Sequence, residues 1–353
     1  MYLRRSAVLK YLVLAPLGIA VYCEWFVYIV QPLFWDDLEC SLDNNGCTKV
    51  LFIADPQIQG DIAVPPPLNY VFNWDSDRYL KSTFSVVQRH FKPDVMVFLG
   101  DLMDEGSIST IPQFHNYVKR LMNIFEVDYP VVQVWLPGDN DIGGENEPIR
   151  KDKIIEFERT FQQPEIITYR NISFYKVNAI THTVPDVSLD PADTNYKIVV
   201  SHYPIISQTH YGRQVNAAIR PNIYFCAHNH ESKYVKQPKD FLSDKETYPL
   251  LYRAPVLNVE ANQDWLYEIY VPTCSYRMGT NKIGYGAAII ENHNQNLRYT
   301  VFWSPQRFPH LFTYLLLGII LGAFILVTCI RHVFSRPLLL EKRNDGIPLL
   351  QRI

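Results

Sequence analysis

The sequence predicts an α/β protein built from two packed β-sheets flanked by helices, with one transmembrane helix at each end of the chain. Short apolar runs typical of strands alternate with helical runs in the first half, and strand-like runs predominate in the second. About twenty apolar residues lie near either terminus. With 353 residues, the chain is long enough for one large domain or two small ones.

The N-terminal apolar run covers residues 11–30 and follows a basic start in residues 1–10. Twenty helical residues at about 1.5 Å each cross the roughly 30 Å core of a bilayer. Glu24 is the single charged residue in the run, and its cost is lower where it faces a partner helix. A cleaved signal peptide is the alternative. We favour an uncleaved span, because the run is long.

The C-terminal run, residues 311–330, carries no charge and is followed by a basic tail, residues 331–353. Basic flanks at both outer ends place both termini in the cytosol by the positive-inside rule. The central domain, residues 48–308, is therefore expected in a lumen or outside the cell, behind a linker of residues 31–47.

Two further features fit a luminal domain. Asn171 begins an Asn-Ile-Ser glycosylation acceptor, and Cys40 and Cys47 are spaced to close a small disulfide loop in an oxidising compartment. The net charge of −3 and the lack of a basic patch with interleaved aromatic residues argue against a nucleic-acid partner.

Periodicity places the predicted elements in order along the domain. Helices are expected at residues 77–91, 112–125 and 151–161, and residues 231–263 have the look of an irregular insertion. Strands are expected at residues 50–54, 95–99, 131–136, 172–177, 197–200, 223–226, 266–271 and 285–290.

Polar side chains follow five of these strands at the point where each strand ends. The carboxyl edge of such sheets is where α/β proteins carry their sites. Carboxylates, amide oxygens and imidazoles suit divalent ions, and two such ions can activate a bridging water and hold phosphate oxygens. The residues are Asp55 and Gln57, then Asp101, then Asp139, Asn140 and Asp141, then His202, and finally His228 and His230.

The order D-x-(H/Q), GD, GN-H-(D/E), H-x-P, GH-x-H resembles that of the calcineurin-like metallophosphoesterases, over about residues 50–230. The DPQ form, the segment GDLMDEG and the flanking apolar helices are similar to one membrane-bound branch. Its members are ER and Golgi phosphodiesterases that remove ethanolamine phosphate from GPI-anchor glycans. The resemblance implies a four-layer sandwich and GPI-anchored proteins as partners. Because two flanking spans would hold the site near the bilayer, we expect a lipid- or glycan-linked phosphodiester as substrate. It also implies two divalent ions, most often Mn, with Zn, Fe or Mg as alternatives.

The resemblance also implies which residues hold the ions and which act in catalysis. Asp101 bridges the two ions, and Asp101, His202 and Asn140 occupy the catalytic positions. The first ion is expected among Asp55, Gln57, Asp101 and His230, and the second among Asp101, Asp139, His202 and His228.

Two positions depart from the family pattern. Gln57 stands where many relatives have His, although its amide still offers an oxygen. GDND replaces GNHD, so Asn140 occupies the place of a histidine that normally protonates the leaving oxygen, an effect typically worth about 10² to 10⁴-fold. His210 and His182 are candidate substitutes, although each is more often a surface histidine.

Alternative functions stay open at this point. One is a luminal phosphomonoesterase or nucleotide phosphodiesterase. Another is a metal-bearing cargo receptor for GPI-anchored proteins, which the loss of histidine at Asn140 favours. Near the site, Asp141 is expected to tether its loop, and Asp104 and Glu105 to orient the turn after Asp101.

Overall fold

The computed structural model describes residues 5–40, 46–187, 194–241, 243–252, 254–260, 264–291 and 296–335. The chain divides into two compact units, residues 27–306 and a unit formed by residues 1–26 with residues 307–353. The outer parts of the two predicted cytosolic ends, residues 1–4 and 336–353, lie outside the described residues.

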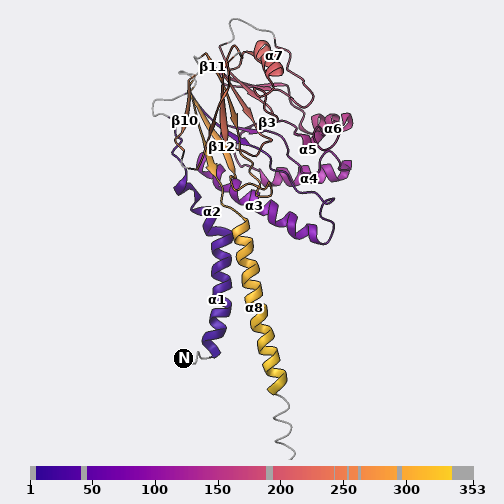
Figure 1. Cartoon of the computed structure of the whole chain (residues 1–353), viewed down its shortest axis with the longest axis vertical. Coiled ribbons are helices and arrows are strands. Elements are labelled where there is room, and N and C mark those ends of the chain that lie inside the picture. Colours follow the sequence, from indigo (N-terminus) through magenta and orange to yellow (C-terminus); the bar gives the residue numbers. More distant parts are fainter. Residues whose placement is uncertain are drawn as a thin grey trace, which may run out of the picture. The chain divides into compact units, whose positions relative to one another are not determined.

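The terminal unit contains α1 (Arg5–Val21), the π-helical turn η1 (Tyr22–Phe26) and α8 (Phe308–Ser335) (Figure 1). Two segments, Lys10–Ile29 and Phe308–Arg331, are long and apolar enough to cross a membrane by length and composition. That they do cross one stays a prediction.

Glu24, the single charge in the N-terminal run, is paired within the terminal unit. Its Oε1 accepts hydrogen bonds from Arg307 Nη1 at 3.0 Å and from the Tyr314 hydroxyl at 2.6 Å. The partner expected for this carboxylate therefore comes from the C-terminal end of the same chain.

The larger unit, residues 27–306, holds two mixed sheets, as predicted. In the first sheet β1, β2 and β3 are parallel to one another, and β12, β13 and β10 extend it in antiparallel fashion. Its order is β10 (Leu257–Glu260), β13 (Asn296–Trp303), β12 (Gly284–Glu291), β1 (Cys47–Ile53), β2 (Val95–Phe98) and β3 (Val132–Trp135).

In the second sheet the central strands β5, β6, β7 and β11 are parallel, and β4, β8 and β9 are antiparallel additions at its two edges. Its order is β4 (Ile166–Tyr169), β5 (Ile172–Lys176), β6 (Tyr196–Val200), β7 (Ile223–Cys226), β11 (Trp265–Tyr270), β8 (Lys233–Pro238) and β9 (Glu246–Pro249).

One buried cluster joins the facing sides of the two sheets, and the rings of Phe52 in β1 and Phe225 in β7 stack at 3.9 Å within it. Alternate residues of β1 face this core, as period-2 strands require. Helices cover the outer faces, so the layers run helix, sheet, sheet, helix. In chain order, the helical elements of this unit are α2 (Val27–Ile29), the 3₁₀ turn η2 (Gln31–Phe34), α3 (Leu68–Phe91), α4 (Ile111–Ile124), α5 (Asp139–Ile142), α6 (Lys151–Phe161) and α7 (Thr209–Ile219).

Two expectations about elements were wrong. Helix α3 begins at Leu68, directly after three prolines, and not at residue 77; proline is well tolerated just ahead of a helix. Residues 231–263 are not irregular, since they contain β8, β9 and β10. β8 pairs with β11, β10 pairs with β13, and β9 pairs with β8. All of β9 is exposed, so pairing rather than an apolar pattern holds it in the sheet.

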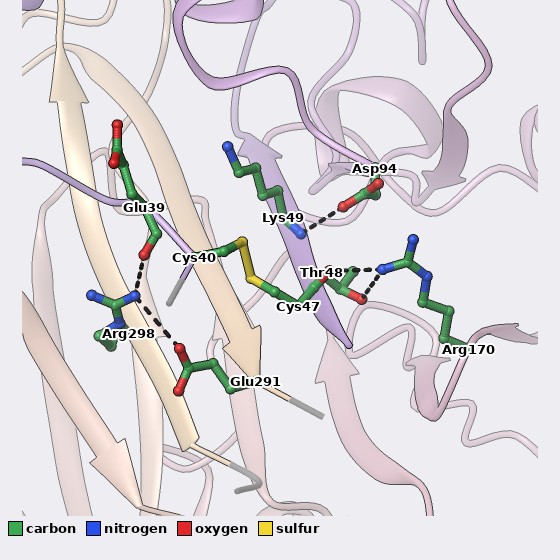
Figure 2. The surroundings of a disulfide bond; sticks show 9 residues. All are labelled: Glu39, Cys40, Cys47, Thr48, Lys49, Asp94, Arg170, Glu291 and Arg298. Atoms are coloured by element: carbon green, nitrogen blue, oxygen red, sulfur yellow. Dashed lines mark hydrogen bonds and ion pairs between the residues drawn. A yellow bond between two sulfur atoms is a disulfide. The ribbon is translucent and has the colours of Figure 1, made fainter. Parts of the chain in front are cut away.

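The structure contains the disulfide between Cys40 and Cys47, with 6.0 Å between their Cα atoms (Figure 2). It ties the linker to the first residue of β1. Arg170 Nη1 donates to the Cys47 carbonyl at 2.7 Å, and Arg298 donates to the carbonyl of Glu39. The disulfide and these two arginines therefore fix the start of β1 and the linker that precedes it.

Removal of this disulfide with Cys40→Ser and Cys47→Ser together is expected to lower the free energy of unfolding by about 2 kcal/mol. The estimate follows from the chain entropy that a loop of this length removes from the unfolded state. Thermal unfolding in detergent, with and without reductant, measures the effect. Reductant should destabilise the natural chain and leave the double variant unchanged.

Candidate metal centre

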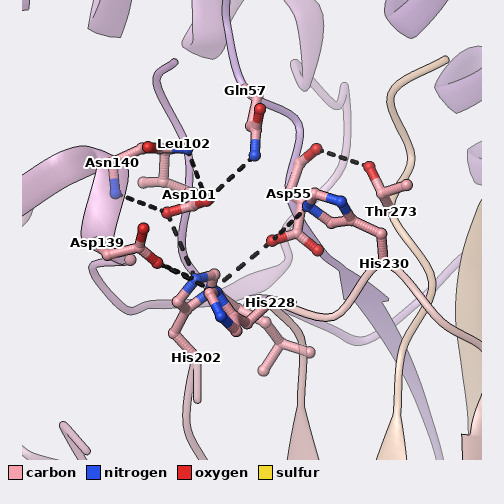
Figure 3. A network of polar contacts seen from close by, with 12 residues as sticks. Asp55, Gln57, Asp101, Leu102, Asp139, Asn140, His202, His228, His230 and Thr273 are labelled. Atoms are coloured by element: carbon pink, nitrogen blue, oxygen red, sulfur yellow. Dashed lines mark hydrogen bonds and ion pairs between the residues drawn. The ribbon is translucent and has the colours of Figure 1, made fainter. Parts of the chain in front are cut away.

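The candidate ligands gather where five parallel strands end. Asp55 follows β1, Asp101 follows β2, Asp139 follows β3, His202 follows β6, and His228 follows β7. Figure 3 shows these side chains converging from loops of both sheets, with Gln57 and His230 beside them. The structure thus brings together all seven residues that the resemblance implies as metal ligands.

Asp55 carries the strongest indication of a bound cation. Its side chain is fully buried, and neither carboxylate oxygen has a hydrogen-bond partner in the structure. Burial raises its pKa although three imidazoles lie near enough to oppose this. A buried carboxylate without hydrogen bonds is costly, and a divalent ion held there would remove that cost. The donor set fits such an ion.

His202 lies at the centre of the site and is buried. Its Nδ1 lies 2.8 Å from the carbonyl oxygen of Leu99 and donates to it, which turns Nε2 toward the carboxylates. Nε2 is 3.0 Å from Asp139 Oδ1 and 3.4 Å from Asp101 Oδ1. Burial alone would lower the pKa of His202, but Asp101, Asp139 and Asp55 outweigh it and raise that pKa to about 10.

Asp139 Oδ1 is shared by two imidazoles, with His228 Nδ1 at 3.2 Å and His202 Nε2 at 3.0 Å. Burial opposes ionisation of Asp139, but the hydrogen bonds from His202 and His228 lower its pKa on balance. These three residues form one group able to hold a metal ion. They match three of the four ligands expected around the second ion.

A second such group joins Asp55 and Asp101 to His202. The expected set differs, because it places Gln57 and His230 with the two aspartates instead. His230 Nε2 lies 3.9 Å from Asp55 Oδ1, at the rim of this group. Burial raises the pKa of Asp101 well above its ordinary value, with neighbouring aspartates adding to the rise.

Amide groups surround the Asp101 carboxylate. Gln57 Nε2 donates to Asp101 Oδ2 at 3.1 Å, and Asn140 Nδ2 donates to the same atom at 2.8 Å. The Asn140 main-chain N–H donates to Asp101 Oδ1 at 2.9 Å. Asn140 therefore lies beside Asp101, where its amide donates a hydrogen bond but cannot act as an acid; its catalytic role stays a prediction.

Several of the candidate metal ligands have an unusual backbone conformation with a positive φ angle. Ten non-glycine residues in the described part of the chain have positive φ, and five of them are candidate ligands. Such conformations cost of order 1–3 kcal/mol each and concentrate at functional sites. The five are Asp55 (φ 48°), Gln57 (44°), Asp101 (50°), His228 (66°) and His230 (54°). No sequence pattern reveals this feature directly.

The turn after β3 is fitted closely around Asp101. A Cβ on Gly138 would lie 2.1 Å from Asp101 Oδ1, so the backbone approaches the carboxylate as only glycine permits. Asp141 accepts hydrogen bonds from the main-chain N–H groups of Leu102, Met103 and Gly138 at 2.8–3.1 Å. Its expected role as a tether of this loop is confirmed.

Sequence reasoning missed Arg277, which lies far along the chain. Its Nη1 donates to the Gln57 carbonyl at 2.9 Å and its Nη2 pairs with Asp104 Oδ2 at 2.6 Å. This guanidinium links the loop of Gln57 to the turn after Asp101, so Asp104 does orient that turn. A lone arginine between two strands offered no pattern that pointed to the site.

His182 and His210 are the candidates to donate a proton in place of the histidine absent at position 140, and they lie together. They line one depression of about 410 Å³ with Tyr211 and its neighbours, and the rings of His182 and Tyr211 meet edge to face at 4.9 Å. Three other histidines are expected to have no part in the site. Of these, His115 pairs with Glu156 at 3.0 Å, and His90 packs on Trp35. His293 lies outside the described residues.

The loop that carries His202 rests on a buried carboxylate. Glu268 in β11 accepts hydrogen bonds from the main-chain N–H groups of Ile205 at 2.6 Å and Ile206 at 3.0 Å. Burial raises the pKa of Glu268 from 4.5 to about 7, and the two hydrogen bonds only partly oppose this. Glu268 is a positioning residue for the loop.

The raised pKa of Glu268 predicts a pH-dependent stability. Its folded pKa exceeds its unfolded value, so its contribution is complete below about pH 4.5 and is lost as the pH rises through about 7. The loss approaches about 3 kcal/mol. Glu268→Gln should make the fall in stability between pH 4.5 and 8 shallower by this amount, because other buried carboxyls such as Asp141 also have a raised pKa. Glu126→Gln, an exposed carboxylate, should leave the fall unchanged.

The sequence profile of the calcineurin-like phosphoesterases matches residues 48–232, about half of the chain and the whole of this centre. The chain belongs to that family. Membership supports a metal-dependent phosphoester hydrolase and agrees with the two groups of ligands described above. The four-layer expectation is met by the two mixed sheets with helices on their outer faces.

This phosphoesterase is similar to curated relatives named Metallophosphoesterase 1. The protein from Danio rerio is 28% identical over 173 residues, which cover 48% of this chain and 44% of the relative. A homolog from Drosophila melanogaster is 25% identical over 125 residues, 35% of this chain and 33% of the relative. The chain thus spans less than half the length of these relatives.

Solved structures are also similar at low identity. A metallophosphoesterase from Sphaerobacter thermophilus is 15% identical and aligns with 72% of this chain and 87% of its own, with a TM-score of 0.35.

Proposed function

We propose that this phosphoesterase is a membrane-anchored phosphodiesterase of the ER and Golgi lumen that removes ethanolamine phosphate from GPI-anchor glycans. In this way it would support transport of GPI-anchored proteins. The observation that carries hydrolysis is the fully buried Asp55 carboxylate, which lacks any hydrogen bond and faces Asp101 and His202 at the ends of parallel strands. The specific substrate rests on the resemblance of the DPQ and GDLMDEG segments to that branch.

Seven residues of this chain would hold two metal ions. Asp55, Gln57, Asp101 and His230 would hold one ion, and Asp101, Asp139, His202 and His228 the other. Two divalent ions, Mn first among them, supply Lewis acidity and an activated water when bound. His202 is held in place by Leu99 O, and Asn140 fixes the orientation of Asp101.

Several features support the membrane topology within this proposal. Two terminal helices have the length and composition of spans, and basic residues gather at or beyond the outer end of each span. Asn171 is exposed at the turn between β4 and β5, where a glycan has access. The Cys40–Cys47 disulfide suits an oxidising lumen. Both termini would then be cytosolic.

The test uses the full chain, purified in detergent and loaded with Mn, against three substrates in parallel. These are an aryl phosphodiester, an aryl phosphomonoester and a GPI glycan that carries ethanolamine phosphate. Release of ethanolamine phosphate with kcat/KM well above that for either aryl ester supports the proposal. Preference for the monoester would replace it with a luminal phosphomonoesterase.

A receptor is favoured by one observation, the asparagine at position 140. Bound metal without turnover of any of the three substrates, together with retention of GPI-anchored proteins on the immobilised chain, would assign the receptor. A mobility shift of the expressed protein on deglycosylation, lost in Asn171→Gln, tests the luminal placement independently.

A further inference from the structure

Residues 62–74 carry no charged side chain although Asp61 and Asp75 flank them. The structure leaves most of their large apolar side chains exposed, with exposed fractions from 47% to 67%. Single exposed apolar residues are ordinary, but a contiguous group marks a docking surface. We call this group the apolar patch: Ile62, Leu68, Tyr70, Val71, Phe72 and Trp74.

The apolar patch comprises the N-terminal end of α3 and Ile62 of the loop before it, and polar contacts fix it to the domain. Asn69 and Asn73, one helical turn apart, both donate side-chain hydrogen bonds to Asp61 Oδ1, at 2.8 and 3.0 Å. The polar positions of these two turns therefore face the domain, and the apolar positions face away from it. Figure 1 shows α3 as a long purple helix beside the sheets.

The apolar patch is also fixed to the metal centre. Glu105, which lies in the turn after Asp101, accepts hydrogen bonds from the main-chain N–H groups of Ile62 at 2.9 Å and Ala63 at 2.6 Å. A Cβ on Gly60 would lie 1.8 Å from Glu105 Oε2, so the loop and the carboxylate are in close contact. These hydrogen bonds therefore fix the start of the apolar patch to the turn that follows Asp101.

The chain enters and leaves the larger unit beside the same helix. Tyr79 of α3 lies edge to face with Tyr28, with 6.2 Å between ring centroids, and its hydroxyl donates to the Pro305 carbonyl at 2.7 Å. Tyr28 and Pro305 lie at the two ends of residues 27–306. Eleven residues separate Leu68 from Tyr79, which is about 16 Å along a helix.

We propose that the apolar patch docks on the surface of a lipid bilayer. The occupant follows from what adjoins α3: the chain continues from both ends of this unit into helices of membrane-spanning composition. A patch with Trp and Tyr among aliphatic residues and without charges matches the interfacial layer of a membrane. The inference rests on the membrane anchoring in the proposed function. It adds that the domain itself contacts lipid and holds the metal centre at the level of a lipid-linked phosphodiester.

The first experiment measures contact of the apolar patch with lipid and does not depend on enzymatic activity. The full chain, with Cys329→Ser, receives one new thiol by Val71→Cys and is labelled with an environment-sensitive fluorophore in liposomes that contain spin-labelled lipid. The control is Ile155→Cys on α6, since Val71 and Ile155 are both 64% exposed. The other described free cysteines are buried.

We expect a blue shift and loss of fluorescence at position 71 and neither change at position 155. A label at position 71 that reports water and is not quenched overturns the inference, and so does equal quenching at both positions. In the first case the patch would remain available for a protein partner. Quenching at position 71 in a chain without any turnover would support docking and refute only the proposed function.

The second experiment separates membrane-bound from soluble substrates. Val71→Asp with Phe72→Asp should raise KM for a bilayer-embedded phosphodiester about tenfold or more, because two apolar side chains no longer enter the interface. The kcat/KM for a soluble aryl phosphodiester should stay unchanged, and Ile155→Asp should alter neither value. If the double variant misfolds, Val71→Ser with Phe72→Ser takes its place. Unchanged KM on embedded substrate contradicts docking.

Discussion

Asp101→Asn is expected to lower turnover of an aryl phosphodiester by about a thousandfold or more and to reduce the amount of bound metal. The substitution removes the negative charge that faces His202 at 3.4 Å. It also turns an amide toward Gln57 Nε2 and Asn140 Nδ2, which both donate to the carboxylate in the natural chain. Donors would then face donors.

Turnover under saturating Mn and metal content after dialysis measure the two effects. Asp94→Asn is the matched control, because Asp94 lies at the opposite end of β2 and accepts a hydrogen bond from the Lys49 main-chain N–H at 2.9 Å. An amide oxygen keeps that bond. Activity of Asp101→Asn within tenfold of the natural chain would remove Asp101 from the reaction.

Asn140→His is expected to raise kcat for a phosphodiester with an alkyl leaving group by about a hundredfold, the lower end of what a general acid contributes. Asn140 already reaches Asp101 through both its main-chain and side-chain N–H groups. An imidazole there adds a proton that the leaving oxygen can take. An aryl leaving group, which departs without protonation, should gain little.

The diagnostic quantity is therefore the change in dependence on the pKa of the leaving group. Asn229→His provides the control, since Asn229 is exposed between His228 and His230 and adds a histidine at the rim. Equal acceleration of both substrates by Asn140→His would show that the gain does not come from proton donation. No acceleration of the alkyl ester would show that the natural chain already has another donor.

The candidate site was predictable because its chemistry is local in sequence. Each ligand directly follows a short apolar strand, and parallel strands bring their carboxyl ends to one edge. Arg277 could not be found in this way, because its partners Gln57 and Asp104 lie over 170 residues away. The positive φ angles of the ligands are likewise a product of the folded turns rather than of residue type.

The fold was predictable where strands are buried on both faces, as in β1, β2 and β7. The prediction from sequence failed at the edges of the sheets. Strand β9 is exposed throughout and exists because it pairs with β8, so its residues needed no apolar pattern. The first turns of α3 were missed for a related reason: their apolar side chains do not follow the period of a helix packed on one side.

The pairing of Glu24 with Arg307 has a consequence for biosynthesis. The two residues are 283 positions apart, so at about 5–20 residues per second a ribosome adds the arginine roughly 14–57 s after the glutamate. Under the proposed topology the first helix enters the membrane long before its counter-charge exists. A chain that ends before Arg307 would carry Glu24 without the hydrogen bond that this arginine donates.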